Sequence, residues 1–487
     1  MTADSPRDLI AGPPFMLTEV RLWPRDREPS SVLVVGSDGR LEYAGRARRP
    51  LDTMPALGLD GAWLLPGFVD PHIHVRASAS ARAAIDISTA TSTGEILDLV
   101  KRHSSADEWI SMWGLQPEQL IDGPPTAEQL DSASGGRLVR IRHRSTHAWV
   151  FSTAALHLFG LGTTPVPAGA HVERRVDGTP TGLVVDHSGW VGDLVGRVTP
   201  IAELEHHVRA WSSELAAQGI VAMVDATARN RESELKQLAE WRAAGIIRQR
   251  LAALASTDIE SAPSPVRFVG HKLMPPFGSD LHAEFTESWS KGIAVAVHCV
   301  EPDELGAVIE TVESIPAERR GRLRIEHASH VPPDWLGRVA ELGGYVVTHP
   351  SFVYAHGDRY LADREAAPHE WLYRLASWRR SRVSLAFASD APAGPTPPLL
   401  GIRAAIQRRT ASGNELGPDE ALSLSEAIAC ATGSAAQAAG LADEGFGRFT
   451  RGKPVNAVVI AAGPDGPSGD DASVIATIIE GHVIEPV

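Results

Sequence analysis

The stretch that decides the fold is LLPGFVDPHIHV, residues 64–75. An apolar run leads into it, and two histidines, His72 and His74, follow two positions apart. Alternate side chains of an extended strand point the same way, so the two imidazole rings share one face. Two polar rings at the end of an otherwise buried strand indicate that this strand end carries chemistry.

The middle of the chain repeats this unit, a short apolar strand that ends in a polar residue and is followed by a helical pattern. Eight such strands are predicted: GFVDPHIHV (67–75), RLVRIRHRS (137–145), GIVAMVDAT (219–227), RFVGHKLM (267–274), IAVAVHCV (293–300), LRIEHAS (323–329), YVVTHP (345–350) and VSLAFASD (383–390). Alternating buried strands and amphipathic helices predict a parallel sheet, and eight such units predict a (β/α)8 barrel.

The two ends of the chain have a different pattern. SSVLVVG and LEYAG flank the turn SDGR (37–40), which predicts a hairpin, and NAVVIAAG near the C-terminus is followed by a second strand-like run after PDGPSGDD (464–471). We therefore expect an α/β protein with a TIM-type barrel at 66–440, a rim insertion at about 76–215, and a small β-sandwich domain built by both termini, 1–65 and 441–487.

Composition and net charge indicate which class of molecule the protein binds. Lys and Arg total 46 against 60 Asp and Glu, and the net charge of −14 disfavours nucleic acid and anionic membranes. We find no pattern of a signal peptide or a membrane span, and the two cysteines exclude a Cys-rich zinc site. The expectation is a cytoplasmic protein that acts on a small molecule, with a homodimer as an open alternative to a monomer.

The polar strand ends predict where the chemistry lies, because parallel barrel strands converge on one mouth. Seven side chains would gather there: His72, His74, Lys272, His298, His327, His349 and Asp390. Imidazoles with a carboxylate form a ligand set suited to zinc or a similar divalent ion, which lowers the pKa of its bound water to roughly 7. Asp390 would bind the ion or its water, accept the water's proton and pass it to the leaving group, which predicts hydrolysis.

Four stretches, PGFVDPHIHV, AVAVHCV, LRIEHAS and LAFASDAP, in this order and spacing resemble the amidohydrolase superfamily of metal-dependent hydrolases. The finer pattern, including THAWVFSTAALHLFGL (146–161) and LSLSEAIACATGSAAQAAGL (422–441), is similar to amidohydrolase family 3, which contains N-substituted formamide deformylases. The resemblance implies first-strand ligands His72 and His74, later ligands His298 and His327, and Asp390 as the eighth-strand acid–base. It also implies that Lys272 either forms a carbamate that bridges two metal ions or turns away from the site, so one or two zinc ions per chain are expected.

The sequence departs from the family pattern in the stretches expected near the substrate. The family's DGH is STH here (145–147), which keeps His147 as a candidate substrate contact, and LMPPFG (273–278) follows Lys272. His349 in VVTHPS is either a substrate contact or a hydrogen-bonded core histidine. These changes leave the predicted ion site intact and bear on the range of substrates.

Our leading hypothesis is the hydrolysis of a C–N bond in an amide, formamide or carbamate-like compound. Glu301, three residues after His298, motivates an alternative, a mononuclear deaminase or cyclic-amidine hydrolase in which Glu301 handles protons at the substrate. The simpler interpretation of Glu301 is an acid at a helix start, favoured by the helix dipole. A third hypothesis, from a different class, is a catalytically silent barrel retained as a binding module.

Overall fold

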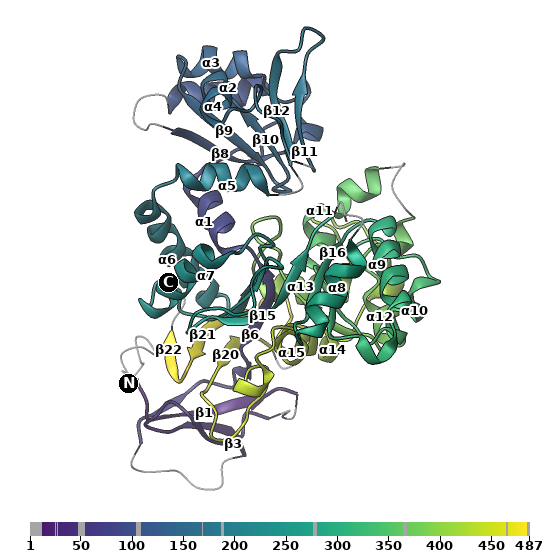
Figure 1. The fold of residues 1–487 in the computed structure, drawn as a ribbon. Helices are drawn as coiled ribbons and strands as arrows, with labels where there is room; N and C mark the ends of the chain where they lie inside the picture. The colour runs from purple at the N-terminus through teal and green to yellow at the C-terminus, as the bar shows by residue number, and fades with distance from the viewer. Residues whose placement is uncertain are drawn as a thin grey trace. The chain divides into compact units, whose positions relative to one another are not determined.

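The computed structural model describes residues 12–24, 26, 28–46, 54–103, 109–167, 169–186, 189–275, 280–363, 368–463 and 466–484. The chain divides into two compact units, each of which is described by itself (Figure 1). The barrel unit comprises 1–74, 212–273 and 279–487, and the insert unit comprises 75–211 and 274–278.

Eight parallel strands form the centre of the barrel unit. In sheet order they are β6 (Phe68–Ile73), β13 (Ile220–Asp225), β14 (Arg250–Ala255), β15 (Arg267–Leu273), β16 (Val295–Cys299), β17 (Leu323–His327), β18 (Tyr345–Thr348) and β19 (Ser384–Phe387). Two backbone hydrogen bonds join the end of β6 to the segment after β19, from Asp390 N to His72 O and from His74 N to Ala391 O, both 2.9 Å. These bonds complete the ring, so the expectation of a (β/α)8 barrel is confirmed.

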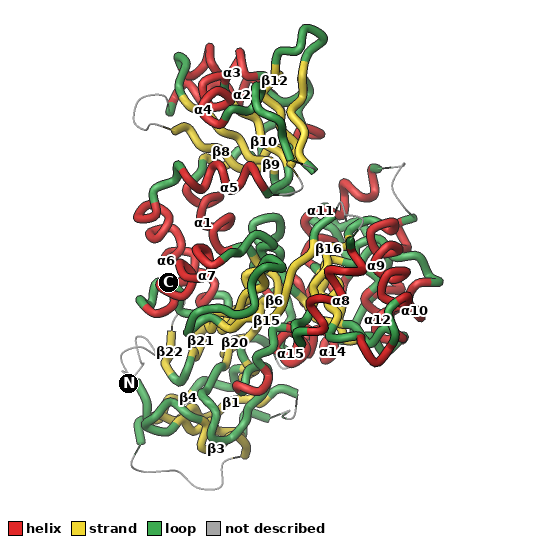
Figure 2. The backbone as a smooth tube through the Cα atoms, in the orientation of Figure 1, coloured by secondary structure: helices red, strands yellow, loops and turns green. Residues whose placement is uncertain are grey.

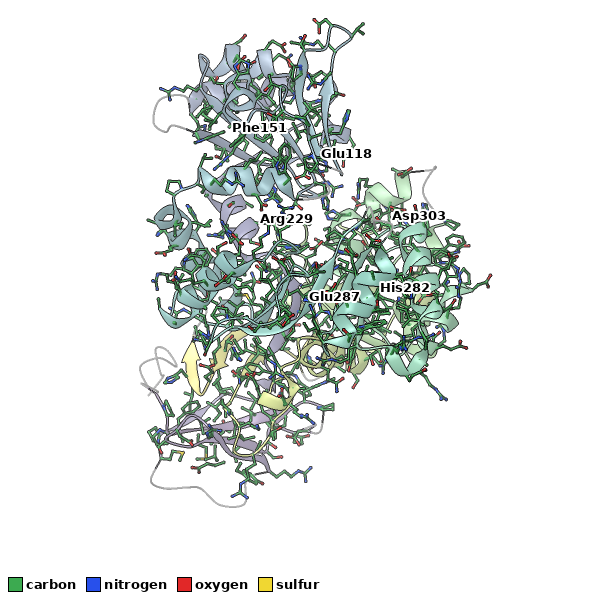
Figure 3. All side chains as sticks on the ribbon, in the orientation of Figure 1. Glu118, Phe151, Arg229, His282, Glu287 and Asp303 are labelled. Carbon is green, nitrogen blue, oxygen red and sulfur yellow. The ribbon has the colours of Figure 1, made fainter. Side chains whose placement is uncertain are left out.

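Helices cover the outside of these strands (Figure 2). They are α6 (Ile201–Ala217, which begins in the insert unit), α7 (Glu232–Ala243), α8 (Leu281–Ser290), α9 (Pro302–Ser314), α10 (Trp335–Glu341), α11 (Ser351–Ala362), α12 (Leu375–Arg380), α13 (Pro398–Gln407), α14 (Leu424–Ala431) and α15 (Gly433–Ala438). α9 buries an apolar face that includes Leu305, Val308 and Ile309, while polar residues such as Asp303 on α9 and His282 and Glu287 on α8 are exposed (Figure 3).

One of the eight predicted barrel strands was wrong. The segment 137–145 forms β9 (Leu138–His143) in the insert unit, and the barrel strand that was missed is β14, with the sequence RLAALA. In β9 apolar and charged residues alternate, and the apolar ones are the buried ones, as in a sheet with one wet face. All of β14 after its first residue is buried, no histidine or carboxylate lies within it or directly after it, and its first acid, Asp258, stands three residues past its end, where it was not used as a signal.

Strands from both ends of the chain form one β-domain within the barrel unit. These strands are β1 (Phe15–Leu22), β2 (Ser31–Val35), β3 (Leu41–Arg46), β4 (Ala56–Gly58), β5 (Trp63–Pro66), β20 (Ala457–Ala461), β21 (Ser473–Ile479) and β22 (His482–Ile484). The N-terminal β5 pairs antiparallel with the C-terminal β20, and β2 and β3 form the predicted hairpin. The expectation that both termini build one small β-domain is confirmed.

The insert unit has its own six-stranded sheet, in the order β11-β12-β10-β9-β8-β7. Its further elements are α1 (Val75–Ala83), β7 (Ile85–Asp86), α2 (Thr93–Arg102), β8 (Trp109–Leu115), α3 (Ala127–Ser134), β10 (Ala148–Phe151), α4 (Thr153–Phe159), β11 (Ala170–Arg174), β12 (Pro180–Asp186) and α5 (Trp190–Arg197). It has a separate hydrophobic core, built around Ile110, Val139 and Ile141. The boundaries 66–440 and 76–215 given above for the barrel and its insertion stay predictions.

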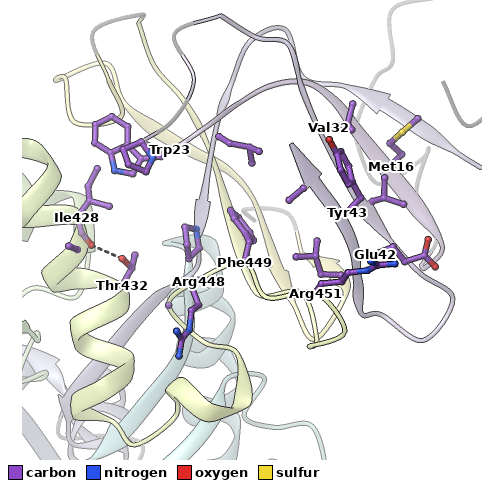
Figure 4. Close-up of a pocket in the computed structure, with 18 of the residues that line it drawn as sticks. Met16, Trp23, Val32, Glu42, Tyr43, Ile428, Thr432, Arg448, Phe449 and Arg451 are labelled. Carbon is purple, nitrogen blue, oxygen red and sulfur yellow. Dashed lines mark hydrogen bonds between the residues drawn. The ribbon is translucent and has the colours of Figure 1, made fainter. Parts of the chain in front are cut away.

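A cavity of about 960 Å³ lies in the barrel unit between the terminal β-domain and α14. Its lining is mainly apolar and includes Trp23, Ile428 and Phe449, with Arg448 and Arg451 at its edge (Figure 4). None of the predicted site residues lines this cavity, so the candidate site is defined by the strand ends instead.

Within the described part of the chain, no helix combines the length and the apolar character that crossing a bilayer requires.

Candidate metal centre

The ends of four barrel strands bring five of the predicted side chains together. His72 lies within β6 and His74 directly after it, His327 ends β17, His349 follows β18, and Asp390 lies three residues beyond β19. His72 and His349 are fully buried, at 1% and 0% exposure. The expectation that polar strand ends meet at one mouth is therefore met by these residues, the outermost of which, His72 and Asp390, lie more than 300 positions apart in the chain.

Two overlapping groups have the geometry of a metal site, and His72 belongs to both. The first group is His72, His74 and Asp390, and the second is His72, His327 and His349; within each, one ligand atom per residue lies within 4.8 Å of the others. The Nε2 atoms of His72 and His74 lie 3.4 Å and 3.2 Å from Asp390 Oδ1. Nitrogen and carboxylate oxygen ligands at this spacing suit a divalent ion such as zinc.

Glu326 orients His72, and the sequence analysis did not assign it a role. Its Oε2 lies 2.5 Å from His72 Nδ1, and a carboxylate only accepts hydrogen bonds, so Nδ1 carries the proton. Burial and the nearby Lys272 lower the pKa of His72 to about 3, so this contact is a hydrogen bond donated by a neutral ring to the carboxylate. The Nε2 lone pair of His72 is therefore directed at Asp390. The signal was present in LRIEHAS, where an acid stands in a strand whose residues are all buried.

Arg324 lies on β17, as Glu326 does, and holds the Glu326 carboxylate in place. Its Nε and Nη2 donate to the two Glu326 oxygens at 2.7 Å and 3.1 Å, and further bonds reach the carbonyls of Pro71 and Ala438, both at 2.9 Å. Burial would raise the pKa of Glu326, but the charges of Arg324 and Lys272 and the bond from His72 hold it well below its usual range. Glu326 is thus a permanent anion that fixes one tautomer of His72, an arrangement typical of metal-binding histidines.

Asp390 remains ionised although it is largely buried. Burial would raise the pKa of this carboxyl, but the hydrogen bond with His74 and the surrounding histidines hold it below its usual range.

The backbone at the site has three non-glycine residues with a positive φ, which is 57° at Asp390, 68° at His327 and 46° at Ala328. Non-glycine residues in this conformation are strained, and they persist where the surrounding structure enforces them, often at functional sites.

Asp70 joins the first and last strands beside the site, and this role was also missed. Its Oδ1 accepts hydrogen bonds from the backbone N–H groups of His72 and Ser389, each at 3.2 Å. Burial raises the pKa of Asp70 to about 6, although these bonds act in the opposite direction. Asp70 therefore connects the segment that carries His72 to the segment that carries Asp390.

Lys272 and His298 lie on neighbouring strands of the same barrel, β15 and β16. Lys272 is 4% exposed, and its Nζ has no hydrogen-bond partner among the described residues. Burial lowers the pKa of Lys272 to about 8. The ring centroid of His298 lies 4.3 Å from that of His327, so this predicted ligand also adjoins the cluster.

Two further predicted site residues are His147, which belongs to the insert unit and stays a prediction, and Glu301, which lies in the barrel unit. His147 lies in the insert unit, immediately before β10, where its carbonyl accepts a hydrogen bond of 2.7 Å from Asp186 N. Glu301 immediately precedes α9, as the helix-start interpretation expects, and its side chain is 57% exposed, with Oε2 3.7 Å from His330 Nδ1. The exposed position of Glu301 gives no geometric support to the deaminase alternative.

The clustered histidines and Asp390 fit a metal ion, and the observation that shows this does not depend on any family. His72 Nε2 and Asp390 Oδ1 are both acceptors, yet they face each other at 3.4 Å. His349 Nε2 is buried without a hydrogen-bond partner among the described residues. Buried acceptors that face each other unpaired cost free energy, and a cation between them removes that cost.

Comparisons with known proteins agree with this geometry. The sequence model of the Amidohydrolase family matches residues 57–484. The N-substituted formamide deformylase of Arthrobacter pascens is 26% identical over 513 aligned positions, which cover 92% of each chain. The putative amidohydrolase YtcJ of Bacillus subtilis is 25% identical and covers 76% of this chain and 79% of its own. The crystal structure of an uncharacterized metal-dependent hydrolase from Pyrococcus horikoshii has the same fold, with a TM-score of 0.73, 21% identity and coverage of 92% and 97%.

Proposed function

Because this chain belongs to the amidohydrolase family and is a metal-dependent hydrolase of carbon–nitrogen bonds, we propose that it cleaves an amide, formamide or carbamate-like bond of a small molecule, with Asp390 as the proton shuttle. The observation that carries the proposal is the approach of Asp390 Oδ1 to the Nε2 atoms of His72 and His74, 3.4 Å and 3.2 Å away. This approach supports the proposal, because an ionised carboxylate beside the expected metal ligands is suited to act as the base.

The residues that would hold the metal share one mouth of the barrel. They are His72, His74, His298, His327 and Asp390, with Lys272 as a further ligand after conversion to a carbamate. The neutral imidazoles favour zinc among the common divalent ions. A divalent ion bound there supplies a Lewis acid that lowers the pKa of water and polarises the scissile carbon.

Asp390 would then move the proton. Its carboxylate, ionised at neutral pH, accepts a proton from the attacking water at one oxygen and delivers it to the nitrogen that leaves. Transfer of that proton turns the leaving group into a neutral amine, which is a far better leaving group than an amide anion. Glu326 keeps His72 in the tautomer whose Nε2 would be available to hold the ion.

The relatives support a choice of first substrate class. The protein from Arthrobacter pascens is, by its name, a deformylase of N-substituted formamides. A formamide has the smallest possible acyl group, so it is the compound class least dependent on a matching acyl pocket. We therefore propose N-substituted formamides ahead of larger amides and carbamates.

A substrate panel tests the proposed function. Zinc-loaded protein is incubated with N-benzylformamide, N-benzylacetamide and a matched N-benzyl carbamate, and release of benzylamine is measured. We expect turnover of at least one compound and its loss after removal of the metal with a chelator. Metal-loaded protein that releases no amine from any acyclic amide, but releases ammonia from an aminated heterocycle, would contradict the proposal.

The state of Lys272 gives a prediction of its own. Its buried and unpaired amine is placed to react with CO₂, losing a proton and forming a carbamate. We expect protein grown with zinc and purified in bicarbonate to hold about two ions per chain, and Lys272→Ala to hold about one. Elemental mass spectrometry measures the ions, and ¹³C NMR after exposure to ¹³C-bicarbonate detects the carbamate carbon.

The surface lysine Lys291 is the matched control for Lys272. It forms ion pairs with Glu260 and Glu287, 3.0 Å and 2.9 Å away, so Lys291→Ala should leave both measurements unchanged. A single ion in the wild-type protein, with no carbamate signal, would show that Lys272 has another role.

A further inference from the structure

His349 is the one buried imidazole of the cluster that neither the sequence pattern nor the comparisons assign to the metal. It follows β18, the strand between β17 and β19, and its side chain is 0% exposed. Its ring lies beside two predicted ligands, with ring centroids 4.8 Å away for His327 and 5.4 Å away for His72. A core histidine would need partners for both of its ring nitrogens.

One nitrogen of His349 has such a partner and the other does not. Nδ1 lies 3.1 Å from the carbonyl oxygen of Ala388, which can only accept, so Nδ1 carries the proton. In the neutral ring Nε2 is then the acceptor, and it is buried without a hydrogen-bond partner among the described residues. The bond that Nδ1 makes to a backbone carbonyl is the outer contact usual for a histidine that binds metal through Nε2.

The ring of His72 carries its proton and its lone pair on the same nitrogens as the ring of His349. Glu326 fixes the proton of His72 on Nδ1, so the Nε2 atoms of His72 and His349 are both acceptors. One ligand atom each of His72, His327 and His349 lies within 4.8 Å of the others, so the three rings form a group that could hold one ion. The ring of Phe352 packs on His349 with a centroid distance of 5.2 Å and limits its rotation.

From these contacts we propose that His349 binds the catalytic metal ion through Nε2, together with His72 and His327. The inference rests on the proposed function, because it requires that the ion be present. It replaces the two earlier interpretations, in which His349 was a substrate contact or a core residue. It also means that β18 supplies a ligand in addition to those expected from β6, β16, β17 and the segment after β19.

The first test is metal affinity, measured without substrate. Metal-free wild-type protein and the variant His349→Gln are titrated with zinc in competition with a chromophoric chelator. Loss of an outer contact typically weakens metal binding about 10- to 100-fold, and we expect loss of a ligand to cost at least as much. The control is His356→Gln, because His356 lies on the following helix and its Nε2 contacts Ala393 O at 3.2 Å. This control should bind zinc like the wild type.

A second measurement separates a ligand from a residue that only supports the fold. In cobalt(II)-substituted protein, a histidine bound through Nε2 has an exchangeable Nδ1 proton whose NMR signal is shifted far from the ordinary range. We expect His349→Gln to lose one such signal while the others and the thermal unfolding of the metal-free protein stay near wild type. Unchanged zinc affinity and an unchanged set of shifted signals, with a raised KM alone, would overturn the inference and return His349 to substrate binding.

The two proposals fail in distinguishable ways. A wild-type protein that binds neither zinc nor cobalt would defeat the proposed function and the inference together. A wild-type protein that binds metal and releases amine, with His349→Gln equal to it in affinity, would defeat the inference alone.

Discussion

Asp390→Asn is expected to lower kcat by about 10²- to 10⁴-fold, the usual contribution of a general acid–base group, while the protein keeps near-normal metal content. Asparagine has the size of aspartate and retains one carbonyl oxygen, which can still face His72 and His74. It cannot accept a proton from water at neutral pH or return one to the leaving nitrogen. Steady-state kinetics of amine release, with metal content measured on the same sample, provide the test.

The matched control for this substitution is Asp303→Asn. Asp303 is an exposed carboxylate on α9 and has no part in the proposed mechanism (Figure 3). Loss of its charge should leave kcat and metal content unchanged. Retained turnover in Asp390→Asn with full metal content would remove Asp390 from the proton transfer. Loss of metal and turnover together would make Asp390 chiefly a ligand.

The second large effect is expected for Glu326→Ala. The substitution leaves the Arg324 guanidinium buried, at 4% exposure, without the carboxylate that it contacts at 2.7 Å and 3.1 Å. Removing one partner of a buried ion pair typically costs roughly 3–5 kcal/mol in the free energy of unfolding. Because His72 also loses its orienting partner, zinc affinity should fall by about 10- to 100-fold. Denaturant unfolding of the metal-free protein measures the first effect, and chelator competition measures the second.

A double variant separates these two consequences. In Arg324→Met with Glu326→Leu, neither charge of this pair is left buried without its partner, so part of the lost stability should return. The recovery is partial because the carbonyls of Pro71 and Ala438 lose the donor that Arg324 provides. Zinc affinity should stay low, since His72 still lacks an acceptor for Nδ1. Recovery of zinc affinity in the double variant would mean that Glu326 acts through stability alone.

Much of the candidate site was readable in the sequence because its signals are local. A histidine or carboxylate after a short buried strand marks a barrel strand end, and this pattern found β6, β13, β15, β16, β17, β18 and β19 with their polar residues. It also led to a wrong second strand, because β9 ends in polar residues as well. β14 was missed since its end carries no such residue, and full burial of both faces does not distinguish a barrel strand from other apolar runs.

The sequence by itself determined the parallel barrel, the β-domain built from both ends and the residue types of an ion site. The signals for these features are the spacing of apolar residues, the turn residues and the polar residues at strand ends, all of which are properties of short segments. Only the tertiary structure decided which nitrogen of each histidine is free and which carboxylate supports which ring. The contacts of Glu326 with His72 and of His349 with Ala388 join residues 254 and 39 positions apart. A hydrogen bond between such distant residues depends on strand order and register around the closed barrel, and these are settled only when the whole chain packs.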